Sequence, residues 1–174
     1  MITQREEAYL QTIPTNKKVS ISPYNPRLSL LAQQIINEVQ QRFPDATIRH
    51  LGAAALEIAG QNELDLYFLA SQSDFGLYLR GIEKIFGKPR NMSETSVAWE
   101  FERDETVVEF YLTDPHSETM QRQIKVFELL QNNTSLRNTY EHIKKQYNGK
   151  LLKDYQRAKY EFYNAILSNS LSID

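Results

Sequence analysis

The segment that decides the fold is residues 48–70, IRHLGAAALEIAGQNELDLYFLA, in which two strand-like runs flank a stretch of small residues. The first run ends at Gly52, and the second alternates apolar and other residues from position 63 onward. A period of two is typical of a β-strand, and it places Glu63 and Asp65 on one face. A glycine turn followed by acids on the next strand suits a phosphate and a metal ion, because backbone N–H groups bind anions and carboxylates bind divalent cations.

Outside this segment, the apolar spacing predicts a mixed α+β chain. Period-two patterns predict strands over residues 19–22, 47–51, 64–70, 97–102 and 106–113. Helical spacing and breaker residues predict helices over residues 5–11, 29–43, 73–86, 117–130, 136–147 and 151–167. We therefore expect a mixed β-sheet with flanking helices and a C-terminal three-helix segment, an order of elements that resembles the nucleotidyltransferase fold.

The predicted elements give one domain over residues 1–174, since neither a long linker nor an internal repeat interrupts the sequence. Residues 1–17 form an N-terminal extension, residues 18–116 a nucleotidyltransferase-like sheet core, and residues 117–174 the C-terminal helices.

Composition excludes several classes of function. The formal net charge of -2 gives no general attraction to nucleic acids or anionic membranes, so neither is expected as a partner. The absence of cysteine excludes disulfides, thiolate zinc sites and cysteine nucleophiles. No apolar run approaches the roughly 20 residues of a membrane helix, and the polar start is unlike a secretory signal. The expected location is cytoplasmic.

Candidate metal ligands lie on two predicted strands. Nucleotidyl transfer needs two or three carboxylates to hold Mg²⁺ or Mn²⁺, which bridges the phosphates and activates the attacking oxygen. Asp65 is the first candidate, and Glu109, between Val108 and Phe110, supplies an acid on another strand. Glu63 is a further candidate because it shares a strand face with Asp65. The alternative is that each acid is an ordinary solvent-facing residue.

Several motifs in a fixed order, spanning about residues 19–167, resemble the GrpB family of nucleotidyltransferase-like proteins. The family carries a PYDP-like opening, a central motif that begins with histidine, any residue and glycine and later contains an acid, and a final helix with a YxxxKxxF signature. The matching positions here are 23–26, His50, Gly52, Asp65, 114–117, Tyr155, Lys159 and Phe162. The resemblance implies that His50, Gly52, Tyr155 and Lys159 bind substrate. Asp65 and Glu109 would then be the catalytic residues, with Asp65, Glu109 and Glu63 as metal ligands.

The sequence also departs from the family pattern at the positions that would bind phosphate. Ala53 and Ala54 replace a serine and a threonine, Gln61 replaces a lysine, and Phe127 replaces an arginine. Each change removes a donor that would stabilise charge on a phosphate. Phe127, a large aromatic residue, is expected to be buried.

Two functional hypotheses follow. In the first, the chain binds a nucleotide or a phosphorylated small molecule, with transferase activity that is weak or lost. In the second, the same scaffold is a non-catalytic protein-interaction module whose C-terminal helices contact a protein partner.

Overall fold

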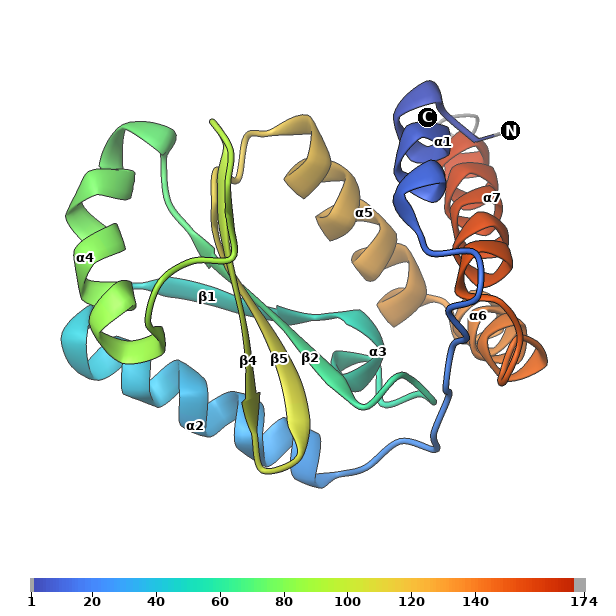
Figure 1. Cartoon of the computed structure of the whole chain (residues 1–174), viewed down its shortest axis with the longest axis horizontal. Helices are drawn as coiled ribbons and strands as arrows, with labels where there is room; N and C mark the ends of the chain where they lie inside the picture. The colour runs from blue at the N-terminus through green and yellow to red at the C-terminus, as the bar shows by residue number, and fades with distance from the viewer. Residues whose placement is uncertain (1, 171–174) are drawn as a thin grey trace. The chain divides into compact units, whose positions relative to one another are not determined.

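The structure is a computed structural model that describes residues 2–170. The described chain divides into two compact units (Figure 1). The sheet unit comprises residues 24–57 and 62–124, and the helical unit comprises residues 2–23, 58–61 and 125–170. The short segment 58–61 belongs to the helical unit through antiparallel pairing of Gly60 with Ser22.

The sheet unit is built on a five-stranded mixed sheet in the order β1-β2-β5-β4-β3. The strands are β1 (Thr47–Leu51), β2 (Glu63–Leu69), β3 (Asn91–Met92), β4 (Ser96–Arg103) and β5 (Thr106–Thr113). Strands β2 and β5 are parallel, and the other neighbouring pairs are antiparallel. Asp104 and Glu105 join β4 to β5 with φ values of 50° and 60°. Two positive φ angles in a two-residue loop match the twist of the strands, which fixes the register of this hairpin.

One face of the sheet forms the core of this unit. Alternate residues of β2 and β5, such as Leu66 and Phe110, are fully buried against α2 (Arg27–Arg42) and α4 (Phe75–Phe86). Helix α2 contributes an apolar stripe that includes Ile35 and Val39, at helical spacing. The Trp99 indole N–H donates to the Gly87 carbonyl at 2.9 Å, which satisfies the only polar atom of that buried side chain. The intervening residues of β2 and β5 occupy the opposite face.

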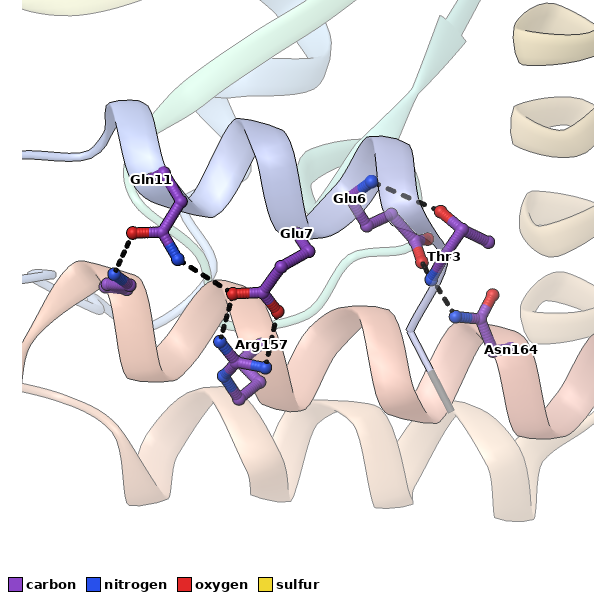
Figure 2. A network of polar contacts seen from close by, with 7 residues as sticks. Thr3, Glu6, Glu7, Gln11, Arg157 and Asn164 are labelled. Carbon is purple, nitrogen blue, oxygen red and sulfur yellow. Dashed lines mark hydrogen bonds and ion pairs between the residues drawn. The ribbon is translucent and has the colours of Figure 1, made fainter.

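The helical unit contains α1 (Gln4–Thr12), α6 (Thr134–Gln146) and α7 (Leu152–Ser170), and the boundary between the units falls within α5 (Glu118–Asn132). Polar contacts fasten α1 to α7 (Figure 2). Arg157 donates two hydrogen bonds to the Glu7 carboxylate, at 2.9 and 3.0 Å. Asn164 donates to Glu6 at 2.9 Å, and Glu6 also forms a capping box with Thr3. The expected N-terminal extension is therefore an ordered helix of this unit.

The α+β class and most predicted elements are confirmed, with three local differences. Residues 19–22 form no strand, because only Lys18 and Ser22 pair, each through an isolated bridge. Helix α3 (Gly52–Ala55) and the two-residue strand β3 were not expected, since both are too short to show a period. Phe127 is buried, as expected. Within residues 2–170, none of the helices combines the length and apolarity that crossing a bilayer requires.

Candidate functional site

Three carboxylates form a row across the middle of the sheet. Asp65 on β2 is the direct cross-strand partner of Glu109 on β5, and Glu109 is in turn the partner of Glu100 on β4. Paired residues on neighbouring strands point to the same face. The row therefore lies on the face opposite the α2–α4 core, because Asp65 alternates with the buried Leu64 and Leu66. Asp65 and Glu109 therefore lie on one face of adjacent strands, as a shared metal site requires.

Glu109 is held by two neighbours. The Tyr111 hydroxyl donates a hydrogen bond to its Oε2. Arg90 Nη1 lies 3.8 Å from its Oε1 and forms a closer ion pair with Glu100. Burial, and then the negative charges of Glu109 and Asp65, raise the pKa of Tyr111 far above its ordinary value. The phenol thus remains a donor, which fixes the orientation of the Glu109 carboxylate.

Gly52 lies so close to Asp65 that only a residue without a side chain fits there. Its φ is +77°, a left-handed conformation that glycine adopts at little cost. A Cβ at this position would overlap the Asp65 Oδ2 and lie 3.0 Å from its Cγ. Leu51, the residue before, is the cross-strand partner of Asp65. The backbone turn at the end of β1 therefore packs directly against the Asp65 carboxylate.

Residues 2–170 provide no preformed metal cage at this site. Glu63 lies on the same face as Asp65, two residues earlier, but its partner on β5 is Val107. In the part of the chain that the structure describes, no group of three or more His, Asp or Glu side chains is placed to hold a metal ion. Asp65 and Glu109 can supply two ligands, so any further ligands would have to come from a bound phosphate and water.

The structure does not bring His50 to this face. His50 is the cross-strand partner of Leu66, so its side chain lies on the core face with Ile48. Its Nε2 is buried and has no hydrogen-bond partner within residues 2–170. Burial lowers the pKa of His50 from 6.5 to about 4, because it disfavours the charged imidazolium. His50 is therefore neutral at pH 7 and faces away from the carboxylate row.

Tyr155 and Lys159 both belong to α7 of the helical unit. Tyr155 is buried beside Val19 and Ile21, and its hydroxyl accepts a hydrogen bond from Lys144 Nζ at 2.8 Å. Lys159 Nζ lies 5.6 Å from the centroid of the Tyr163 ring. Tyr155 thus contacts α6 and the segment around Val19, and Lys159 contacts Tyr163 of its own helix. The role of Tyr155 and Lys159 toward a substrate stays a prediction.

Sequence reasoning missed the other residues around the row. Glu100 had a usable signal, because a two-residue turn at 104–105 pairs positions 100 and 109 once the hairpin is drawn. Tyr67 and Tyr111 form a stacked pair with ring centroids 4.8 Å apart, next to the row on the same face. Arg90 had no signal, because it reaches the row from the segment before β3 only in the folded chain.

Comparison with known proteins identifies the family of this chain. The family model described as GrpB protein matches residues 18–169 and so begins after α1. The crystal structure of the conserved protein GrpB from Enterococcus faecalis matches with a TM-score of 0.68 and 14% identity, covering 87% of this chain and 99% of that chain. A structure of the Cid1 poly(U) polymerase with MgGTP bound matches with a TM-score of 0.48 and 14% identity, over 80% of this chain and 44% of that one. No curated protein matches. The chain belongs to the GrpB family.

Proposed function

We propose that this GrpB-family protein binds a nucleotide or another phosphorylated small molecule together with Mg²⁺ or Mn²⁺, and that its transferase activity is weak or lost. The observation that carries the proposal is the direct cross-strand pairing of Asp65 with Glu109 on the face opposite the apolar core. The glycine turn packed against Asp65 adds support, because it brings the backbone at the end of β1 to the same carboxylate.

Two carboxylates suit a metal that arrives with its phosphates. Mg²⁺ keeps several waters and is commonly held by one or two protein carboxylates plus phosphate oxygens. Because no three carboxylates among the described residues are placed to hold one metal ion together, the bare ion would bind weakly. A phosphate chain supplies further oxygen ligands, so we expect metal and phosphate to bind cooperatively.

The same residues argue against efficient transfer. Ala53 and Ala54, in the short helix α3 after β1, have no hydroxyl to donate to a phosphate. Gln61 and Phe127 stand where the family carries a lysine and an arginine, and Phe127 is buried. Loss of one donor to developing charge commonly costs about a hundredfold or more in rate.

The test is a calorimetric titration with each of the four ribonucleoside triphosphates, with Mg²⁺, with Mn²⁺ and without metal. We expect binding only with metal, and a decrease in affinity of about tenfold or more in Asp65→Asn and Glu109→Gln. Asp45→Asn and Glu94→Gln are matched controls, because both acids are exposed in loops of the same unit. A pyrophosphate-release assay on the same samples should give little or no turnover. Metal-dependent binding that survives both site substitutions would place the ligand elsewhere.

One observation favours the interaction-module alternative. Arg90 offsets part of the negative charge of Glu100 and Glu109, and the stacked pair of Tyr67 and Tyr111 adjoins the row. Such a surface could be stable without any ligand. Under this alternative the protein binds none of the four triphosphates, and substitution of Asp65 changes only its stability.

A further inference from the structure

We propose that Arg90 is the phosphate-binding cation of this site, held in position by Glu100. This inference rests on the proposed function and extends it to a residue outside the family motifs. It also indicates the class of ligand, because a fixed arginine beside a metal-binding carboxylate selects a phosphate chain bound as its metal complex.

Arg90 is held where it can act on such a ligand. Its backbone N–H donates to the Ala98 carbonyl at 2.8 Å, which anchors the residue to β4 at the edge of the sheet. From there Nη1 pairs with Glu100 and lies 3.8 Å from Oε1 of Glu109. The guanidinium therefore adjoins a carboxylate that we assign to the metal, and Asp65 lies one strand further on.

The guanidinium also has donors to spare. A guanidinium carries five N–H donors in a planar fork, and both carboxylate contacts of Arg90 use Nη1. Nε and Nη2 have no partner within residues 2–170, and 49% of the side chain is exposed. A planar fork with unused donors fits the oxygens of a phosphate, whereas an isolated charge-balancing role would need only the contacts already present.

Charge gives Arg90 opposite effects on a bare ion and on a metal–phosphate complex. A divalent ion bound to Glu109 is repelled by the guanidinium about 4 Å from that carboxylate, so Arg90 weakens binding of the ion alone. A phosphate chain reverses the sign of this effect, so that Arg90 strengthens binding, because the phosphate oxygens accept hydrogen bonds from Arg90 while they coordinate the metal. A residue that only stabilised the fold would not change these two affinities in opposite directions.

The experiment measures two affinities in the full chain, for Mn²⁺ alone and for inorganic tripolyphosphate in the presence of Mn²⁺. We expect Arg90→Gln to tighten binding of Mn²⁺ alone by about threefold and to weaken tripolyphosphate binding by about tenfold or more, the cost of a charge-assisted hydrogen bond. Arg90→Lys should lose less, because it keeps the charge without the fork. Glu100→Gln should weaken tripolyphosphate binding by a smaller factor, through loss of the group that holds Arg90. Arg80→Gln, at an exposed arginine on α4, is the matched control and should change neither affinity.

The outcomes separate this inference from the proposed function. If Asp65→Asn abolishes binding of the Mn²⁺–tripolyphosphate complex while Arg90→Gln leaves both affinities unchanged, the metal site stands and the role of Arg90 is wrong. If Arg90→Gln lowers both affinities together, Arg90 is only structural and the inference is equally overturned. If the wild-type protein binds neither probe, the proposed function and this inference fail together. Thermal melts of each variant show whether loss of binding reflects loss of fold.

Discussion

Replacing Gly52 with alanine tests how closely the β1 turn is fitted to Asp65. At a φ of +77°, an L-residue pays a conformational cost of about 1–2 kcal/mol. Alanine also restricts the unfolded chain more than glycine does, which offsets about 0.4–1 kcal/mol of that cost. The new Cβ must also displace the Asp65 carboxylate, whose Cγ would be 3.0 Å away. Overpacking of this kind costs about 1–3 kcal/mol.

Gly149→Ala is the matched control, because Gly149 has a φ of +78° and open space where a Cβ would be placed. The two substitutions thus share the backbone term and differ in the clash. We expect urea denaturation to show a loss of about 1 kcal/mol for Gly149→Ala. Gly52→Ala should lose about 1–3 kcal/mol more than the control.

The reasoning also requires a second effect of Gly52→Ala. Because the substitution displaces the Asp65 carboxylate, metal-dependent binding of tripolyphosphate should weaken as in Asp65→Asn, whereas Gly149→Ala should leave it unchanged. Equal losses of stability in the two alanine variants, with unchanged ligand affinity, would show that Asp65 relaxes freely and that the fit of Gly52 to Asp65 has no consequence.

Three further substitutions test buried groups by urea denaturation. Phe127→Arg should destabilise the fold by about 3–5 kcal/mol, because Phe127 is buried and an unpaired guanidinium there loses its hydration. A loss of stability below about 1 kcal/mol would show that this position tolerates a charge. Tyr155→Phe should cost about 1–3 kcal/mol, because it removes the hydroxyl that accepts from the buried Lys144; an unchanged unfolding midpoint would contradict this. For His50, the folded pKa of about 4 lies below the unfolded value of 6.5, so the unfolded chain binds more protons in this window and stability falls as the pH drops through it. His50→Leu should remove up to about 3 kcal/mol of this pH dependence, and an identical pH profile in both proteins would refute the assignment.

Much of the sheet could be predicted because its strands obey a period of two over enough residues. Residues 63–69 alternate between core and opposite face along their whole length, so Asp65 had to lie away from Leu64 and Leu66. The parity of β1 is ambiguous, because the apolar Ile48 shares a face with His50 whereas the apolar Leu51 shares the face of Asp65. The expectation that His50 binds substrate came from the family resemblance alone.

Other features depend on contacts that no local pattern encodes. Arg90 lies 19 positions before Glu109 in the sequence. The two residues come close only because β3 pairs with β4 and β4 pairs with β5. The alternation at 19–22 predicted a strand, but pairing there stops at single bridges, so the pattern alone did not suffice. The residues of α1 predicted a helix and left open where it packs, because the pairing of Glu7 with Arg157 joins opposite ends of the chain.

The most direct test of the central claim is paramagnetic broadening of backbone amide signals by Mn²⁺ in the ¹⁵N-labelled protein, with inorganic tripolyphosphate present. Broadening falls off steeply with distance from the ion and therefore locates it. The proposed site predicts that the amides of Gly52, Asp65 and Glu109 broaden first and that Asp65→Asn removes the effect, while Asp45→Asn does not. Broadening centred on another part of the chain, or none with tripolyphosphate in excess, would contradict a metal–phosphate site on this face of the sheet.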